Sequence, residues 1–236
     1  MDPLLSVDGV ISGYRDIPVL HGVSFDIPRS GVTAIIGPNG HGKSTLLRTI
    51  SGLNRIWAGT ITFEGGRLPE TAHARARLGL VHVPQGDQLF MGMTVEENLM
   101  MGAHSRDDGA AGRRTLDEVY TLFPRLQERR MQRVNSLSGG ERRMTGIGRG
   151  MMAGGKLMMI DEPSLGLAPL LIEQIYAALG QLAKSGRAIL VVEENPSRVE
   201  AVASQFFLMD GGRFVWSGDG GELRRSGDIL ATYLGG

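Results

Sequence analysis

The segment Gly37–Ser44 reads GPNGHGKS and fits the pattern G-x-x-x-x-G-K-[ST], whose residue types suit phosphate binding. Its glycines let consecutive backbone N–H groups turn toward phosphate oxygens, and a helix that begins here adds positive potential. We expect Lys43 to reach the β- and γ-phosphates of a nucleotide and Ser44 to hold Mg²⁺. A chance glycine-rich turn is the alternative, but the segment joins an apolar strand pattern to a helical one, as phosphate binding requires. We call residues 37–44 the phosphate cradle.

Two adjacent carboxylates end a second apolar run. Leu157–Ile160 reads LMMI, and Asp161 and Glu162 follow directly. The end of such a strand lies beside the cradle in an open α/β sheet. We expect Asp161 to hold Mg²⁺, directly or through water, and Glu162 to polarise the attacking water or accept its proton. Alone, such a pair is equally consistent with solvated loop charges, and the upstream cradle favours the chemical roles.

Short apolar runs alternate with helical patterns along most of the chain. Val32–Ile36 predicts a buried parallel strand before the cradle, and Lys43–Ile50 predicts the helix that follows it. Further predicted elements are strands at Leu4–Val10, Val19–Ile27, Ile61–Phe63, Leu80–Pro84 and Ala188–Val192, a helix at Leu170–Ala183, and a hairpin across Phe206–Trp216 that turns at Asp210-Gly211-Gly212. This alternation predicts a parallel sheet with helices on its faces.

The middle of the chain differs from its flanks. From Thr94 to Met152 the pattern is helical and more polar, and Leu116–Leu126 has apolar residues at helical spacing. Arg106–Arg114 is charged and glycine-rich, so we expect a surface loop there. We interpret this block as a helical insertion between the strands that carry the cradle and the paired acids.

The composition excludes several classes of protein. The 236 residues are 42% hydrophobic, which suffices for one buried globular unit. The 25 basic and 25 acidic residues balance, which argues against nucleic acid as a partner. The chain has no Cys, so disulfides and thiolate metal sites are excluded. We find neither an apolar run long enough to cross a membrane nor a secretory signal at the start.

A third motif, Leu137-Ser138-Gly139-Gly140-Glu141, lies shortly before the acid-ended strand. Together with the cradle and the acids, it resembles the ABC transporter ATPase family, whose signature reads LSGG followed by an acidic residue or Gln. The resemblance covers nearly the whole chain. It implies that this signature segment starts a helix that faces the γ-phosphate held by an opposite subunit, because helix N-termini attract anions.

The resemblance also implies a fold. We expect an α/β protein of the P-loop NTPase class, with a RecA-like parallel-sheet core, an antiparallel β subdomain and a helical subdomain. The core and the β subdomain are expected at residues 1–86 and 156–236, and the helical subdomain at residues 87–155.

Several family roles carry over by position. Tyr14 matches the aromatic residue that stacks on adenine, although a strand-face tyrosine is the alternative. Gln85 matches the glutamine that contacts Mg²⁺ and the attacking water, and Ser164–Leu167 matches the loop that crosses the dimer interface. The residues expected to bind nucleotide are Tyr14, Gly37, Asn39, Gly40, Gly42, Lys43, Ser44, Thr45, Ser138, Gly139, Gly140 and Glu194. The residues expected to act in catalysis are Glu162, Gln85 and Lys43, and those expected to hold Mg²⁺ are Ser44, Gln85 and Asp161.

A narrower likeness concerns the transported solute. Pro84–Gly86, Thr94–Leu99, Asp161–Pro169 and the ending Ala231–Gly235 are similar to the smaller ATPase of branched-chain amino acid importers. This likeness implies ATP hydrolysis that powers import, with membrane permeases, a second ATPase subunit (a sister or a second copy) and, indirectly, a solute-binding protein as partners. It places the chain at the cytoplasmic face of the membrane.

We expect the permease to dock on Gly86–Asn98, where Leu89–Met91 reads as exposed and apolar. Ordinary packing between subdomains is the alternative for that segment. Four other functions stay open: an ATPase for urea or another small solute, an exporter ATPase, a non-transport ABC ATPase, and a weakly hydrolysing regulatory module. The last finds support only in Glu194.

Four positions depart from the family pattern. Glu194 stands where most members have a His that binds the γ-phosphate, and where branched-chain importers commonly have Gln. A carboxylate would be repelled there, so we expect it to turn away from the phosphates, with protonation of Glu194 or slow turnover at this site as the alternatives. His41 occupies a usually small position in the cradle and is expected to point to solvent. We interpret Arg142 and Arg143, which follow the signature, as a solvated helix face, with contacts to phosphate or to a partner as the alternative.

Overall fold

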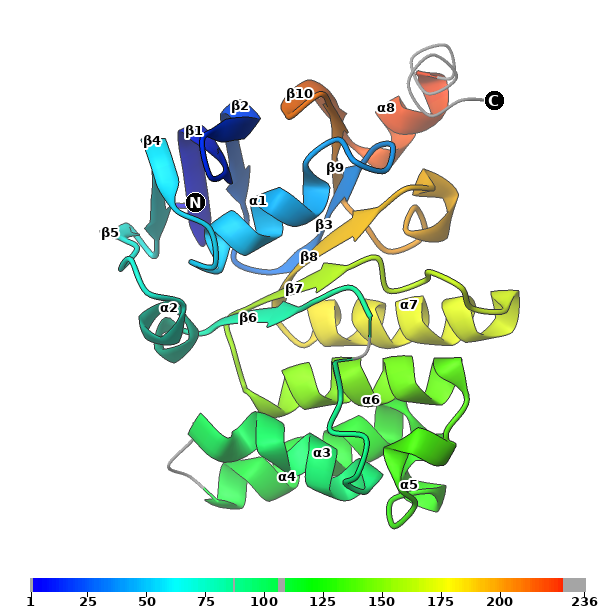
Figure 1. The fold of residues 1–236 in the computed structure, drawn as a ribbon. Helices are drawn as coiled ribbons and strands as arrows, with labels where there is room; N and C mark the ends of the chain where they lie inside the picture. The colour runs from blue at the N-terminus through cyan, green and yellow to red at the C-terminus, as the bar shows by residue number, and fades with distance from the viewer. Residues whose placement is uncertain (1, 87, 106–108, 227–236) are drawn as a thin grey trace.

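The computed structural model describes residues 2–86, 88–105 and 109–226. Two sheets and a group of helices form the molecule (Figure 1). The strands are β1 Leu5–Tyr14, β2 Ile17–Ile27, β3 Gly31–Ile36, β4 Ile56–Phe63, β5 Gly66–Arg67, β6 Leu80–Val83, β7 Leu157–Asp161, β8 Ala188–Glu193, β9 Gln205–Asp210 and β10 Arg213–Gly218. The α-helices are α1 Lys43–Ile50, α2 Ala72–Leu78, α3 Val95–Gly102, α4 Gly109–Leu122, α5 Pro124–Glu128, α6 Gly139–Met152, α7 Pro169–Lys184 and α8 Gly220–Arg225.

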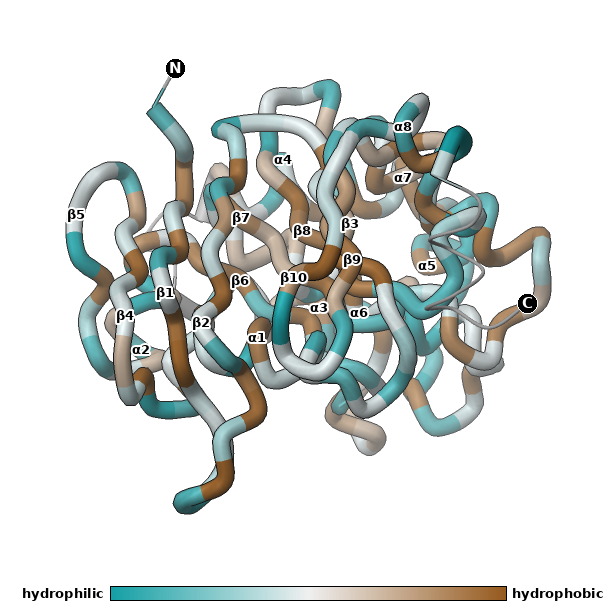
Figure 2. The backbone as a smooth tube through the Cα atoms, turned by 90° about the horizontal axis from the view of Figure 1, so that it is seen from above, coloured by the Kyte–Doolittle hydropathy of each residue, from teal (hydrophilic) through white to brown (hydrophobic). Residues whose placement is uncertain are grey.

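The larger sheet has the order β10-β9-β3-β8-β7-β6, and all neighbours are parallel except β10 and β9. Strands β3, β7 and β8 are buried on both faces, which explains their largely apolar sequences and their central place in Figure 2. Parallel strands end at one edge, so the segments after β3, β6, β7 and β8 emerge together. This edge brings the cradle, Gln85 and the paired acids to one place.

The smaller sheet is antiparallel, with the order β2-β1-β4-β5. Helix α1 packs between the two sheets, because its Leu46, Leu47 and Ile50 share one buried cluster with β1 and with β3. The helix that leaves the cradle is therefore fixed from both sides. Helices α6 and α7 share the other cluster with the opposite face of the larger sheet.

Helices α3 to α6 lie together at the bottom of Figure 1. The insertion begins with a capping box at Thr94, whose side chain and backbone pair with Glu97. The expected loop at Arg106–Arg114 is wrong from Gly109 onward, where α4 has already begun. Its first residues include helix-favouring Ala and Arg, which outweigh the glycines. Residues 106–108 lie outside the described part of the chain.

The α/β fold class is confirmed, with a mixed sheet, an antiparallel sheet and a helical insertion. The subdomain bounds stay a prediction. Helix α2 has no strong sequence signal, because its buried position is Arg75 and it carries no apolar stripe. Within the described residues, no helix is long and apolar enough to span a membrane. The ending Ala231–Gly235 lies outside the residues that the structure describes.

Candidate functional site

The phosphate cradle joins β3 to α1. Gly37 has a φ of 152°, and a Cβ atom there would lie 2.2 Å from the Met209 carbonyl oxygen, so only glycine fits. A cavity of about 290 Å³ opens at the cradle. Its lining consists of Asn39, Gly40, Gly42, Lys43, Ser44, Thr45, Gln85 and Glu162. Eight residues predicted from three separate motifs therefore meet around one cavity.

Lys43 lies inside the cradle rather than in solvent. Its Nζ donates hydrogen bonds to the carbonyl oxygens of Gly37 at 2.7 Å and Pro38 at 2.9 Å, and lies 3.8 Å from Glu162 Oε1. Burial lowers the pKa of Lys43, and nearby carboxylates oppose that shift. The cradle thus holds a desolvated cation where an entering anion would meet it.

Asp161, the last residue of β7, is buried beside the start of α1. Burial raises the pKa of its carboxyl, and a hydrogen bond with the Ser44 side chain opposes that rise. Among the described residues, Asp161 Oδ1 has no hydrogen-bond partner. A buried carboxylate oxygen without a donor, next to a serine hydroxyl, fits a hard cation such as Mg²⁺.

Glu162 and Gln85 come from different strands and touch each other. Gln85 Nε2 donates to Glu162 Oε2 at 2.9 Å. Burial raises the pKa of the Glu162 carboxyl, with the positive charge of Lys43 opposing the rise. A carboxylate with a raised pKa at the edge of a polar cavity is suited to accept a proton.

Tyr14 ends β1 next to the cradle. Its ring is exposed, and its hydroxyl lies 3.4 Å from Thr45 Oγ1. The ring therefore stands beside the start of α1, although it does not line the cradle cavity. Stacking on adenine stays a prediction.

The signature segment lies apart from this cavity. Ser138 caps α6 in a capping box with Glu141, which occupies the backbone N–H groups of both residues. A Cβ on Gly140 would lie 2.3 Å from Leu171 Cδ1, so this glycine also permits α6 to approach α7. The described residues that line the cradle cavity include none from Leu137 to Glu141.

Glu194 does not turn away from the cradle, so that expectation is wrong. Its Oε2 accepts a hydrogen bond of 2.9 Å from Asn39 Nδ2. Its negative charge also opposes the fall that burial causes in the pKa of Lys43. Its negative charge therefore lies at the rim of the cradle, where it would weaken the binding of phosphate.

We expect Glu194→Gln to lower the Kd for ATP by about tenfold and to raise the hydrolysis rate. The repulsion between the Glu194 carboxylate and a phosphate charge about 4 Å away is worth about 1 kcal/mol in water and about 4 kcal/mol at an effective dielectric of 20. Because Glu194 is exposed, we expect an effect near the lower end of this range. Calorimetry and phosphate release would measure both effects. Glu173→Gln, an exposed change on α7, is the matched control. Unchanged affinity and rate would show that Glu194 weakens neither ATP binding nor hydrolysis.

His41 does not simply point to solvent either. Its Nδ1 lies 2.7 Å from Asp210 Oδ1 and 3.2 Å from the backbone nitrogen of Gly211. The Gly212 N–H also donates to the His41 carbonyl oxygen. The cradle is thereby attached to the turn between β9 and β10, a contact that no local pattern indicates.

The prediction of a solvated face at Arg142 and Arg143 is wrong for Arg143. This side chain is 5% exposed and turns toward the catalytic edge of the sheet. Arg142 is half-buried and donates to the Leu137 carbonyl oxygen at 2.8 Å. The helix approaches the larger sheet more closely here than the charged sequence indicates.

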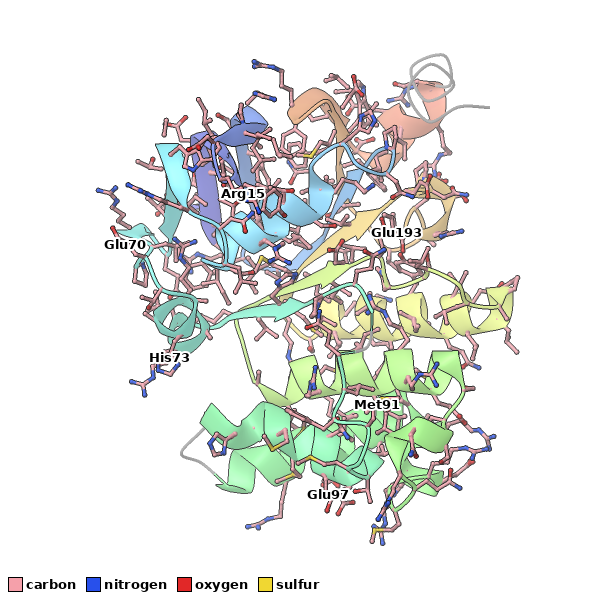
Figure 3. All side chains as sticks on the ribbon, viewed as in Figure 1. Arg15, Glu70, His73, Met91, Glu97 and Glu193 are labelled. Carbon is pink, nitrogen blue, oxygen red and sulfur yellow. The ribbon has the colours of Figure 1, made fainter. Side chains whose placement is uncertain are left out.

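A buried carboxylate at the end of β8 was also missed. Glu193, labelled in Figure 3, is 1% exposed. Its Oε1 accepts hydrogen bonds from the Tyr176 hydroxyl at 2.5 Å and the Ser164 amide at 3.2 Å. Arg198 lies 3.6 Å from Glu193 Oε2 and donates to Ser164 Oγ. The end of β8 thus holds the loop that follows Glu162. In the sequence, the signal for a buried Glu193 is its position at the end of a buried strand.

The expected docking segment is only partly exposed. Leu89 is 9% exposed and belongs to the core, so it was wrongly predicted as surface, whereas Phe90 and Met91 are exposed. A groove of about 400 Å³ lies beside Phe90, between β6 and helices α3 and α6. Arg149 lines this groove and stacks over the Phe90 ring at 5.7 Å.

Comparison with known proteins agrees with these motifs. Residues 20–165 match the family described as ABC transporter. The chain is 39% identical to the high-affinity branched-chain amino acid transport ATP-binding protein BraG of Pseudomonas aeruginosa, over 99% of this chain and 100% of that protein. It is 34% identical to the probable branched-chain amino acid transport ATP-binding protein LivF of Archaeoglobus fulgidus, over 90% of each.

A solved ATP binding subunit of an ABC transporter has the same fold. It is 29% identical and superposes with a TM-score of 0.84, over 98% of this chain and 96% of that chain. The family match spans the cradle, the signature and the paired acids. The chain therefore belongs to the ABC transporter family, as an ATP-binding subunit that hydrolyses ATP.

Proposed function

We propose that this ATPase powers the uptake of branched-chain amino acids through a membrane permease. The observation that carries the proposal is the likeness to BraG and LivF, two proteins named for branched-chain amino acid transport, over nearly the whole chain. The residues of the site described above are assigned to the nucleotide and not to the solute. The identity of the solute is therefore inferred from that likeness alone.

The geometry supports a division of roles at the cradle. Lys43 and the backbone N–H groups of the cradle bind the β- and γ-phosphates, and Tyr14 stacks on the base. Ser44, Asp161 and Gln85 would hold Mg²⁺, which when bound would neutralise phosphate charge. Glu162 accepts the proton of the attacking water, and the Gln85 amide that donates to Glu162 helps to orient that water.

A complete site takes two ATPase chains in this proposal. The capping box uses the N–H groups of Ser138 and Glu141, which leaves the first-turn amides of Gly139 and Gly140 without acceptors in their own helix. These amides and the helix dipole suit an anion. Since the signature does not line its own cradle, the γ-phosphate that it meets belongs to a second copy or a sister chain.

The groove beside Phe90 is our proposed permease contact, at the cytoplasmic face of the membrane. Its lining includes Pro84 and Gln88, which flank Gln85 in sequence, and residues of α6, which starts at the signature. Its exposed apolar side chains and Arg149 suit an amphipathic segment. A solute-binding protein enters this account only indirectly, through the permease.

Uptake in cells tests the proposal. In a strain that lacks the chain, we expect the wild-type sequence, and not Glu162→Gln, to restore uptake of radiolabelled leucine, isoleucine and valine. Immunoblots would show equal amounts of both proteins. Restored uptake of urea without restored uptake of leucine would assign the chain to a different importer and contradict the proposed solute.

A further inference from the structure

Arg143 is a buried cation in the second turn of α6, five residues after Ser138. It is 5% exposed, and a buried charge is stable only when hydrogen-bonded or paired. Its guanidinium reaches out of the helical insertion and into the edge of the larger sheet, where the hydrolysis residues lie.

Three main-chain carbonyl groups receive its hydrogen bonds. Nε donates to Pro163 at 3.3 Å, Nη2 to Asp161 at 2.5 Å and Nη1 to Pro84 at 3.0 Å. Asp161 and Pro163 are the two neighbours of Glu162, and Pro84 directly precedes Gln85. One side chain therefore holds the backbone on both sides of the proposed base and next to its glutamine partner.

The backbone at Glu162 needs such support. Its φ is +44°, in the left-handed region that residues with a Cβ rarely adopt. The following proline narrows the conformations of Glu162 further. Strained conformations persist only where their surroundings impose them, and here Arg143 and the bond from the Glu162 amide to the Val192 carbonyl oxygen do so.

We propose that Arg143 is a positioning residue, which fixes the Glu162 carboxylate and Gln85 for hydrolysis and connects them to the signature helix. This inference rests on the proposed roles of Glu162 and Gln85. Only a guanidinium offers five planar donors, so lysine or glutamine cannot bind three diverging carbonyl oxygens at once. Because Arg143 lies on α6, a shift of the signature helix moves the carbonyl groups around the base.

Arg143→Met tests this proposal. We expect kcat for ATP hydrolysis to fall by about 100-fold, because a misplacement of about 1 Å costs that much, while the Kd for ATP changes by less than about twofold. Arg143→Gln, which keeps two N–H donors, is expected to recover part of kcat and serves if the methionine variant does not fold. Phosphate release, calorimetry and thermal melting on the same samples give kcat, Kd and Tm.

Arg75→Met is the matched control. Arg75 is also a buried arginine, 4% exposed, and it donates to the carbonyl oxygens of Pro69, Thr49 and Ile50, away from Glu162 and Gln85. We expect this variant to lose similar thermal stability but to keep the wild-type kcat. A wild-type kcat in Arg143→Met, or an equal loss of kcat in both variants, would overturn the positioning role. A wild-type chain that neither binds nor hydrolyses ATP would overturn the proposed site itself.

Discussion

Glu162→Gln is expected to lower ATP hydrolysis by roughly 10³-fold, because positioned proton transfer contributes on the order of 10² to 10⁴ to a rate. The substitution keeps the size of the side chain and its hydrogen-bonding oxygen toward Gln85, but it cannot accept a proton from water. Burial raises the pKa of the Glu162 carboxyl, so this group is a better base than an ordinary glutamate. Phosphate release at saturating ATP would measure the loss.

Binding of ATP should survive this substitution. Glutamine removes one negative charge near the phosphates, so we expect a Kd for ATP equal to or below that of the wild type. If two chains close around ATP, the variant should also accumulate as an ATP-dependent dimer in size-exclusion chromatography, because nothing reopens it. A variant that still hydrolyses ATP within a few-fold of the wild type would show that Glu162 is not the base.

Lys43→Ala is expected to raise the Kd for ATP by about 100-fold or more. Lys43 is placed to make charge-assisted hydrogen bonds to two phosphate groups, and each is worth about 1.5–3 kcal/mol. The fold should tolerate the change, because burial lowers the pKa of Lys43 and the ammonium is therefore disfavoured there. Calorimetry would measure affinity, and thermal melting would check the fold.

Lys184→Ala, at the end of α7, is the control for Lys43→Ala and should bind ATP like the wild type. A Lys43→Ala variant that is folded and binds ATP with unchanged affinity would place the nucleotide elsewhere on the molecule. If Lys43→Ala loses both ATP binding and the folded state, the same measurements are made on Lys43→Met, which removes the charge but keeps the aliphatic part of the side chain.

The sequence predicts those parts of the site that depend on local rules. Glycines that turn backbone N–H groups inward, a lysine and a hydroxyl at fixed spacing, and acids at a strand end are all short-range patterns. Their meeting around one cavity follows from the parallel strands, which end at one edge. Buried strands also follow a local pattern, a short and largely apolar run. The expected ends of β3, β7 and β8 therefore lie within about one residue of the ends in the structure.

The features that were missed depend on contacts between distant segments. Arg143 looks like a surface charge in sequence, and only the approach of α6 to the sheet shows its buried partners. Leu89 is apolar in either environment, so its sequence cannot separate a core residue from a docking residue. Glu194 was expected to turn away from phosphate, but the Asn39 amide holds it at the rim. Each case turns on a partner that another segment of the chain supplies or on a packing surface.

The most direct test of the account is phosphate release from MgATP by the purified chain, measured over a range of chain concentrations beside Lys43→Ala. We predict hydrolysis by the wild type, at a rate per chain that rises with concentration as two chains complete each site, and none above background from Lys43→Ala. Equal rates from the wild type and from Lys43→Ala, or a folded wild-type chain that does not bind ATP, would contradict the assignment of ATP hydrolysis to this cradle.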